Sequence, residues 1–399
     1  MSTTNMERSN EASNTAIPSR KFPTGASTSA YRLVEELLVQ ADIEIGGERP
    51  WDIRLLAQGV PERVLAQGNL GLGEAYMEGQ WECDEIDQFF SRIMRAHIDE
   101  KIRPSRLVLH ALRARFLNRQ TARRAWKVGQ VHYDIGNEFY EAMLDSRMTY
   151  TCGYWAAGAH TLEAAQEEKL DLICRKLQLK PGMRLLDIGC GWGSLMGFAA
   201  EYYGVECVGV TISQEQAEWG RQRYAGMPVE FRLQDYRTLN EQFDRIASVG
   251  MFEHVGAKNY RIYMEVAHRC LHDDGLFLLH TIGKNRRQST PDPWMDRYIF
   301  PNGELPSIGH IGDAAGGLFV VEDLHNFGAD YDRTLMAWHA NVEAAWPQFA
   351  DQMGERFHRM WRYYLLSCAG LFRARDIQLW QWVLSKEGIA GGYRRPAVR

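Results

Sequence analysis

Short runs of consecutive apolar residues alternate with longer stretches of helical spacing from about residue 160 onward. Such runs are typical of strands buried on both faces, and recurrence every three or four residues is typical of the helices that cover them. The predicted strands are 184–188, 206–211, 229–233, 243–249 and 275–280. The predicted helices are 163–177, 194–203, 213–224 and 260–271. This β-α-β-α order predicts an α/β fold with a doubly wound, mostly parallel sheet.

The two ends of the chain follow other patterns. Residues 345–384 are rich in aromatic side chains and are predicted to be helical. In the N-terminal part, the segment 41–51 alternates like a strand and ends in a turn, and glycines at 68–73 are expected to break a helix. The predicted helices of this part are 30–40, 61–67 and 85–96. A smaller mixed α/β unit is therefore expected, preceded by a disordered leader at 1–28, which has few apolar groups.

A basic segment at 101–127 contains no Asp or Glu. Its basic residues are Lys101, Arg103, Arg106, Arg113, Arg115, Arg119, Arg123, Arg124 and Lys127. One interpretation is a solvated connecting helix whose arginines pair with acids elsewhere. The other is an amphipathic basic helix that meets anionic phosphate on a membrane surface. Nucleic acid is not an expected partner, because no stacking platform or reading motif accompanies the charge.

Composition narrows the class of protein. The chain has 399 residues, a net charge of -5 and 45% hydrophobic residues, which are ordinary values for a globular protein. It contains no run of 18 apolar residues, and its polar N-terminus lacks the apolar core of a signal peptide. The seven cysteines form no Cys-x-x-Cys pair, so neither a disulfide framework nor a metal site is expected. A reducing, cytoplasmic setting is the simplest expectation.

The candidate chemistry begins at a glycine-rich turn after the first predicted strand. Asp187 ends the strand, and Gly189, Gly191 and Gly193 follow it at Gly-x-Gly-x-Gly spacing. Glycine lets the backbone turn tightly and approach a ligand at the carboxyl end of a strand. The spacing favours S-adenosylmethionine over a dinucleotide, and Asp187 is expected to meet the ammonium group of that cofactor. A turn that is purely structural is the alternative.

Two later segments are expected to complete the cofactor site. No carboxylate follows the second strand at the position that often holds ribose, so Thr211 or Gln216 would have to serve there. After the third strand, Asp235 offers a side-chain acceptor and Tyr236 offers an aromatic face for adenine.

Several longer motifs are more specific than the glycine turn. They are His132-Tyr133-Asp134-Ile135-Gly136-Asn137, Tyr150-Thr151-Cys152-Gly153-Tyr154-Trp155, the run 249–256 with Phe252-Glu253-His254, the run 278–283, the run 298–303, and Phe327-Gly328-Ala329-Asp330-Tyr331-Asp332. On these motifs the sequence resembles the bacterial cyclopropane-fatty-acyl-phospholipid synthases, from about residue 30 to the end. Thr151 and Gly153 depart from the residues the family often carries. The related mycolic-acid synthases are shorter and lack the N-terminal unit, so the phospholipid branch is favoured.

The resemblance implies a fold and a reaction. The fold is a Rossmann-like S-adenosylmethionine-dependent methyltransferase sheet, with Tyr150 and Thr151 also at the cofactor. The methyl group is added to a cis double bond of a phospholipid acyl chain, and the resulting carbocation loses a proton and closes to a cyclopropane ring. The implied base is bicarbonate. Its implied cage is Cys152, Glu253, His280, Ile282 and Tyr331, with backbone groups of Cys152 and Ile282 contributing.

The same resemblance sets the expected organisation and partners. After the leader, the expected units are an N-terminal lipid- or membrane-associating domain at 29–112, a basic linker helix at 113–130 and a catalytic methyltransferase domain at 131–399. The expected partner is a membrane phospholipid with unsaturated chains. The protein is expected to be a cytoplasmic homodimer that associates reversibly, as a peripheral protein, with the inner face of the membrane.

Other interpretations remain open at this point. One is an S-adenosylmethionine-dependent methyltransferase that acts on another lipid or a small molecule without ring closure. Another is a lipid-binding or regulatory protein with a vestigial cofactor fold, which the presence of the whole proposed cage disfavours. Cys152 and Tyr331 could be packing residues, and His254 is expected to be structural. The helical aromatics Trp338, Trp346, Trp361, Tyr363 and Tyr364 are expected to be core more than acyl channel.

Overall fold

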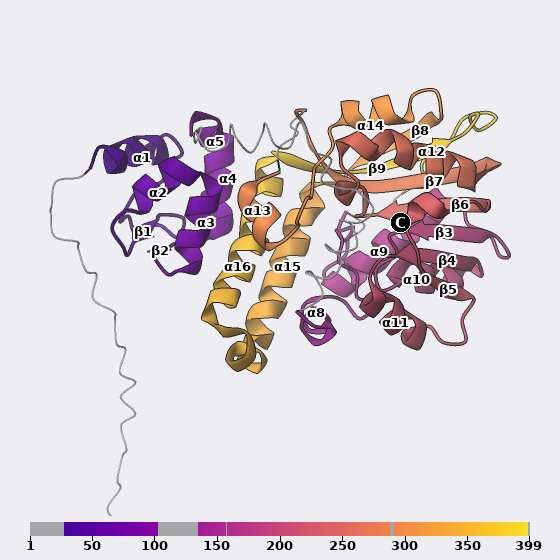
Figure 1. The fold of residues 1–399 in the computed structure, drawn as a ribbon, viewed down its shortest axis with the longest axis horizontal. Coiled ribbons are helices and arrows are strands. Elements are labelled where there is room, and N and C mark those ends of the chain that lie inside the picture. The colour runs from indigo at the N-terminus through magenta and orange to yellow at the C-terminus, as the bar shows by residue number, and fades with distance from the viewer. Residues whose placement is uncertain (1–27, 103–134, 157, 288–290, 398–399) are drawn as a thin grey trace, which may run out of the picture.

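The computed structural model describes residues 28–102, 135–156, 158–287 and 291–397 (Figure 1). The predicted leader and almost all of the basic segment lie outside these residues, so the expectations made for them stay predictions. Three bodies follow one another across Figure 1: the N-terminal unit, a layer formed by two long helices, and a sheet covered by helices.

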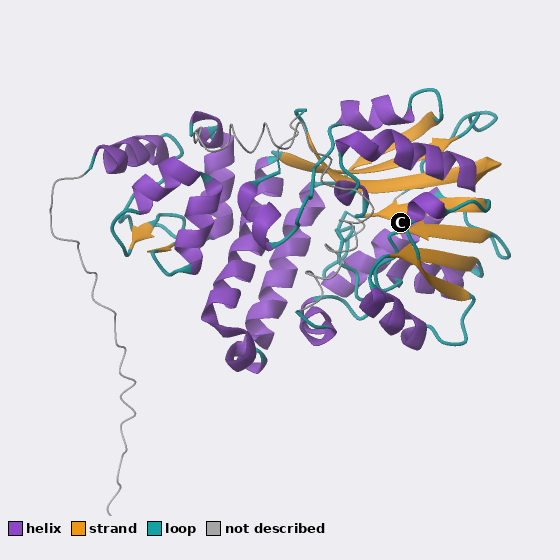
Figure 2. Ribbon diagram, in the orientation of Figure 1, coloured by secondary structure: helices purple, strands orange, loops and turns teal. Residues whose placement is uncertain are grey.

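A seven-stranded sheet forms the C-terminal body (Figure 2). Its strands are β3 (Arg184–Ile188), β4 (Glu206–Thr211), β5 (Val229–Leu233), β6 (Phe243–Val249), β7 (Leu271–Lys284), β8 (Val320–Asn326) and β9 (Ile377–Ser385). They lie in the order β5-β4-β3-β6-β7-β9-β8, with β9 antiparallel to both of its neighbours and the first five strands parallel. The doubly wound, mostly parallel sheet predicted from the sequence is therefore confirmed.

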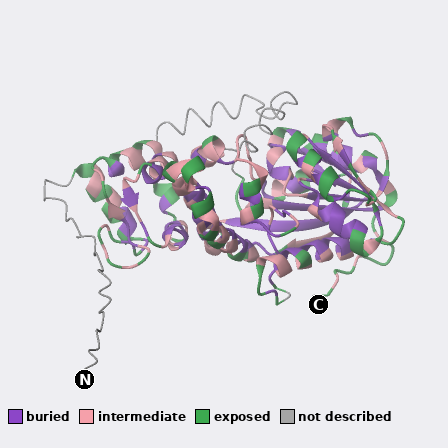
Figure 3. Ribbon diagram, turned by 90° about the horizontal axis from the view of Figure 1, so that it is seen from below, coloured by how far each residue is buried: buried purple, intermediate pink, exposed green. Residues whose placement is uncertain are grey.

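Helices cover both faces of this sheet because successive strand residues point to opposite sides. Leu185 packs with α9 (Leu162–Lys176), α10 (Ser194–Tyr203) and α11 (Gln214–Arg223). Its neighbour Leu186 belongs to the other face, with α12 (Tyr260–Cys270) and α14 (Ile308–Ala315). Both faces are thus buried along the central strands, which explains why those strands read as apolar runs (Figure 3).

The prediction of one helical region at 345–384 is wrong in its last part. The helix α15 (Ala329–Ala345) begins earlier than predicted, and α16 (Ala350–Ala374) ends at Arg375, whose φ of 66° is left-handed. Residues 377–385 then form the buried strand β9. An apolar segment such as 379–384 reads equally well as a buried helix or a buried strand, so the pattern alone could not decide.

The N-terminal unit is mostly helical. Its elements are α1 (Ser29–Val39), β1 (Arg54–Leu55), α2 (Val60–Gln67), α3 (Asn69–Met77), β2 (Trp81–Glu82), α4 (Ile86–Arg95) and α5 (Ile98–Lys101). The strand predicted at 41–51 is reduced to a single bridge between Ile45 and Ile53. Of the glycines at 68–73, Gly68 separates helix α2 from helix α3, as predicted. Gly71 and Gly73 do not interrupt a helix, because they lie inside α3. A side chain at Gly73 would meet the Trp294 ring at 2.5 Å, so close packing requires glycine there.

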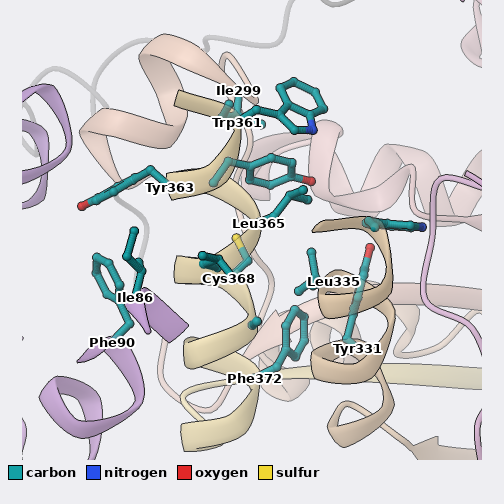
Figure 4. Close-up of a cluster of buried hydrophobic side chains, with 14 of the residues drawn as sticks. Ile86, Phe90, Ile299, Tyr331, Leu335, Trp361, Tyr363, Leu365, Cys368 and Phe372 are labelled. Atoms are coloured by element: carbon teal, nitrogen blue, oxygen red, sulfur yellow. The ribbon is translucent and has the colours of Figure 1, made fainter. Parts of the chain in front are cut away.

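The N-terminal unit shares its core with the long helix α16. Figure 4 shows side chains of α4 on one side of α16 and side chains of α15 on the other. Tyr363 of α16 meets Phe90 edge to face at 5.4 Å, while Phe372 stacks on Tyr331 at 4.5 Å. Two further helices, α8 (Asn137–Met143) and α13 (Pro293–Tyr298), complete this region. A division of the chain at residues 112 and 130 remains a prediction, since both positions lie outside the described residues.

Among the residues that the structure describes, no helix is both long enough and apolar enough to cross a bilayer.

Candidate active site

A cavity of about 430 Å³ opens at the carboxyl ends of the parallel strands. Its wall includes Asp187 near the end of β3, Thr211 at the end of β4, Gly250 directly after β6 and Ile282 on β7. The sheet order places β3 and β6 side by side with their following connections leaving in opposite directions, and ligands of doubly wound folds bind at such a switch point. Helices α15 and α16 close the other side through Tyr331 and Tyr364.

The three glycines of the turn have different roles. Gly189 has a φ of 84°, and a side chain there would meet Met251 at 2.5 Å. Gly191 has a φ of 54° and faces open space, because the nearest protein atom, Gln216 Nε2, lies 3.9 Å from where a Cβ would stand. Gly193 is not on the cavity wall, and its Cβ would strike the Phe231 ring at 2.3 Å. Gly191 thus provides room for a ligand, whereas Gly193 permits close packing between α10 and the sheet.

Asp187 carries an acceptor that its surroundings leave unused. The side chain is 3% exposed, and Oδ1 has no hydrogen-bond partner among the described residues. Burial raises the pKa of Asp187 to about 7, and the nearby Lys169 ammonium opposes this rise. A buried acceptor without a partner is costly unless a ligand supplies the donor. The position therefore suits a bound ammonium group.

Lys169 is a site residue that the sequence analysis missed. It lies on α9, is buried at 1% exposure, lines the cavity and donates from Nζ to Thr151 Oγ1 at 2.9 Å. Burial lowers its pKa to about 8 against the attraction of Asp145, Cys152 and Asp187. One signal was available: Ala165, Lys169, Leu172 and Ile173 share one helical stripe, so a lysine interrupts the apolar face.

The part of the wall expected to hold the nucleoside contains the predicted residues. They differ in how far their polar atoms are already used in hydrogen bonds within the protein. Thr211, Gln216, Asp235 and Tyr236 all line the cavity. Thr211 Oγ1 donates to Gln216 Oε1 at 3.3 Å. Both oxygens of Asp235 accept from Arg237, at 2.9 Å from Nε and 2.6 Å from Nη2. Burial, which raises the pKa of Asp235, is outweighed by these bonds, so its pKa is lowered.

Glu253 holds one oxygen fixed and leaves the other unpaired. It lies in the short helix η2 (Phe252–His254), and its Oε1 accepts from the backbone N–H of Ile282 at 2.6 Å. Oε2 is buried and has no partner in the described part of the chain. Burial raises the pKa of Glu253 to about 7, and the Ile282 bond opposes this rise. The Ile282 N–H expected to help hold an anion therefore orients Glu253 instead, while the Ile282 side chain lines the cavity.

His280 lies two residues before Ile282 on β7, so both side chains point to the same face of the sheet. The ring is 1% exposed, and Nε2 has no partner among the residues described. Burial lowers the pKa of His280 well below its ordinary value, and the charges of Lys169 and Lys176 lower it further. A neutral imidazole is therefore placed behind the cavity wall, which does not itself include His280.

Tyr331 and Cys152 differ in how they meet the cavity. Tyr331 lines it, and burial raises the pKa of its hydroxyl, helped by nearby Cys152 and Glu253. Cys152 is fully buried outside the wall, and its Sγ donates to Gly153 O at 3.1 Å. Burial raises the pKa of this thiol well above its ordinary value, which disfavours the thiolate that a nucleophilic cysteine needs. His254 packs its ring at 5.9 Å from Phe300.

The cavity is lined by aromatic side chains, namely Tyr140, Tyr150, Trp192, Tyr236, Phe300, Tyr331 and Tyr364. The Tyr150 and Tyr364 hydroxyls lie 2.9 Å apart. Of the five helical aromatics singled out from the sequence, only Tyr364 reaches this wall. Trp338, Trp361 and Tyr363 are buried in the core and Trp346 stacks on His358.

Comparison with known proteins finds cyclopropane synthases among the relatives of this chain. A family model described as mycolic acid cyclopropane synthetase matches residues 120–382. Cyclopropane-fatty-acyl-phospholipid synthase of Escherichia coli strain K12 is 54% identical over 366 residues, covering 91% of this chain and 95% of the relative. The solved cyclopropane synthase MmaA2 from Mycobacterium tuberculosis has a TM-score of 0.62 at 34% identity, covering 65% of this chain and 98% of its own. Mycolic acid cyclopropane synthase CmaA1, solved with SAH and CTAB, has a TM-score of 0.61 at 35% identity, with the same shares.

The sheet, its glycine turn and these matches define an enzyme of the S-adenosylmethionine-dependent methyltransferase class. Within that class, the chain belongs to the cyclopropane synthase family, alongside the fatty-acyl-phospholipid synthases. The resemblance seen in the sequence motifs is thereby confirmed.

Proposed function

We propose that this enzyme transfers a methylene group from S-adenosylmethionine to the cis double bond of an unsaturated acyl chain in a membrane phospholipid. The product is a cyclopropane ring, and the proton acceptor is bicarbonate. One observation carries the proposal: Asp187 Oδ1 and Glu253 Oε2, on the wall of one aromatic-lined cavity, are buried polar atoms without partners in the described structure. His280 Nε2 is a third such atom, on a residue that lies behind the wall, two positions before the wall residue Ile282. Unpartnered polar atoms at a cavity are most simply explained as contacts kept for ligands.

The residues at the glycine turn fit the cofactor. S-adenosylmethionine supplies, when bound, a methyl group on a positively charged sulfur. Asp187 Oδ1 would accept from its ammonium group, and the space in front of Gly191 would receive the backbone-facing part of the ligand. Thr211 and Gln216 offer polar side chains to the ribose, while Tyr236 offers an aromatic face. Asp235 is already paired with Arg237, so we assign it to shaping this wall.

The aromatic wall suits the acyl chain. An alkene is a weak nucleophile, so the protein must hold it close to the methyl group and in line with it. Methyl transfer leaves a positive charge on the acyl chain. The π-faces of Tyr140, Tyr150, Trp192, Tyr331 and Tyr364 can stabilise a cation in a site poor in water. The same side chains offer apolar surface to the hydrocarbon before reaction.

The Glu253 side of the cavity fits bicarbonate, which needs hydrogen-bond donors for its oxygens and an acceptor for its hydroxyl. Bicarbonate supplies, when bound, a weak base for the acidic protons of the new methyl group. Glu253 Oε2 is the free acceptor, neutral His280 offers a donor from Nε2, and the Tyr331 hydroxyl lies in the same wall. Ile282 N–H keeps the Glu253 carboxyl from swinging toward the cation, where it would form an ester.

The extent of similarity favours phospholipid over mycolic acid as substrate. The Escherichia coli phospholipid synthase aligns with 91% of this chain, whereas MmaA2 covers 65% of it although 98% of its own length is matched. The N-terminal unit packed on α16 is thus part of what the phospholipid enzyme shares. We propose that this unit and the basic segment bring a cytoplasmic homodimer reversibly to the inner membrane surface.

The proposal is tested with the purified full chain, methyl-labelled S-adenosylmethionine and vesicles of unsaturated phospholipid. Label should enter the acyl chains, and degassed buffer without bicarbonate should slow its entry. Label found on a head group or on a small added amine would instead support a methyltransferase without ring closure.

A further inference from the structure

A row of polar side chains crosses the sheet beside the candidate base site. His280 on β7, Gln381 on β9 and His325 on β8 are directly opposed in the strand register. Directly opposed residues on neighbouring strands share a face, so the three side chains lie next to one another. Gln381 is fully buried and His280 is 1% exposed, in a sheet whose neighbouring positions are apolar. Buried polar side chains in an apolar sheet are unfavourable, because each loses its hydration on folding. Their presence therefore indicates a specific hydrogen-bonding role.

The amide of Gln381 faces the ring of His280. Gln381 Nε2 lies 3.1 Å from His280 Nδ1. In this orientation of the amide its nitrogen donates, and Nδ1 accepts with its lone pair. Burial opposes a positive charge on the imidazole, and nearby Lys169 and Lys176 oppose it further, so the ring is neutral. A neutral ring with a lone pair on Nδ1 carries its single proton on Nε2, the atom that has no partner in the described residues.

We propose that Gln381 is a positioning residue that holds His280 in the Nε2–H tautomer, so that His280 presents a hydrogen-bond donor to the base site. The assignment of the bicarbonate contact rests on the proposed function, whereas the tautomer itself follows from the Gln381 contact. In the opposite tautomer Nε2 would present a lone pair, and an anion would be repelled instead of held.

The other members of the row do not compete for His280. His325 Nδ1 lies 3.0 Å from Lys176 Nζ, and Lys176 also lies 3.8 Å from Asp323. His325 is thus held by its own cation on the far side of Gln381. The ring of Phe327 packs between the two histidines, 5.8 Å from His280 and 5.1 Å from His325. Gln381 is the residue through which the position of the His280 proton is set.

The tautomer can be read directly in the full chain labelled with ¹⁵N-histidine. Long-range ¹H–¹⁵N correlation separates the two neutral tautomers, and the His280 signals are identified by their loss in His280→Asn. Wild type should show the Nε2–H form. Gln381→Leu should show a mixture. Gln381→Glu, studied at a pH where its buried carboxyl is ionised, can only accept and should shift the ring to Nδ1–H. Gln378→Leu removes another buried glutamine of β9, one that contacts Asn326 and Arg375, and should leave the His280 signals unchanged.

Kinetics supplies the functional readout. The bicarbonate KM of ring formation should rise about 10-fold in Gln381→Glu, the lower range for loss of a partner that orients a histidine. S-adenosylhomocysteine binding should be unchanged. An Nδ1–H form in wild type, or an unaltered tautomer in both Gln381 variants, would overturn the proposal. If the tautomers change as expected while wild type ignores bicarbonate, the role of Gln381 stands and the bicarbonate assignment fails.

Discussion

Replacing Glu253 by Gln changes one atom of the candidate base site and keeps its shape. The amide oxygen can still accept from Ile282 N–H, which now binds Glu253 Oε1 at 2.6 Å. The amide NH₂ then stands where Oε2 stood, so an acceptor facing the site becomes a donor. A bound bicarbonate would lose the acceptor for its hydroxyl while the cavity keeps its volume.

The substitution should lower the rate of ring formation and raise the free energy of unfolding. Ring formation should fall about 10²-fold, the low end for a positioned acid-base group, which equals about 2.7 kcal/mol of transition-state stabilisation. The free energy of unfolding should increase at neutral pH, because the cost of ionising the buried carboxyl is removed. Burial raises the pKa of Glu253 from 4.5 to about 7, so ionising this carboxyl costs the folded chain up to about 3 kcal/mol.

The size of the stability effect depends on pH. A carboxyl with a raised pKa binds its proton more tightly in the folded chain than in the unfolded chain. It therefore costs no stability below about pH 4.5, and the cost grows until the pH passes about 7. Gln does not titrate. The free energy of unfolding of Glu253→Gln, relative to wild type, should thus rise between these pH values and then level off.

The assay combines urea unfolding at about pH 4.5 and about pH 8 with ring formation at neutral pH. Glu265→Gln is the matched control, because Glu265 is an exposed carboxylate of α12 paired with Arg261. The control should change neither activity nor the pH dependence of stability. Full activity of Glu253→Gln, together with no response of wild type to bicarbonate, would refute the assignment of this carboxyl.

Further predictions concern the cofactor, the cage and the membrane. Gly191→Val should abolish S-adenosylhomocysteine binding in calorimetry while the sheet stays folded by circular dichroism, because the new side chain enters open cavity; retained binding would place the ligand elsewhere. If the Tyr331 hydroxyl only orients the ion, His280→Ala should reduce ring formation more than Tyr331→Phe does. Wild-type rates in both variants would show that neither residue contributes to the bicarbonate site. Removing basic charge should weaken sedimentation with anionic vesicles, most of all at low salt, and unchanged sedimentation would move the contact to the N-terminal unit. The substituted residues, each changed to Gln, are Arg113, Arg115, Arg119 and Arg123.

The sequence was most informative where one physical signal dominates. The short runs between predicted helices gave β3 to β6 with their observed bounds, and the turn after Asp187 located the cavity. Wrong predictions arose where one pattern of residues fits two structures. The apolar run of β9 fits a buried helix as well as a strand, and Gly71 and Gly73 look like helix breakers although neighbouring side chains require them inside α3.

Tertiary contacts account for the rest of the site. Nothing local shows that Ile282 N–H binds Glu253, or that Gln381 meets His280 from another strand. Lys169 was visible only as a charge on an apolar stripe, and its meaning depends on the carboxylates around it. The types of the site residues thus indicated the chemistry. Their hydrogen-bond partners could not be predicted, because those partners lie on strands and helices distant in sequence.

The central claim is ring formation on a phospholipid acyl chain, and its most direct test is the structure of the lipid product. Purified full chain is incubated with S-adenosylmethionine and vesicles of a phospholipid with one cis double bond per acyl chain, and the acyl chains are analysed by mass spectrometry and proton NMR. The proposed function predicts a gain of one CH₂ per chain, loss of the olefinic protons and appearance of cyclopropane protons. A methylated chain that keeps its double bond, or an unmodified chain with the methyl group elsewhere on the lipid, would contradict it.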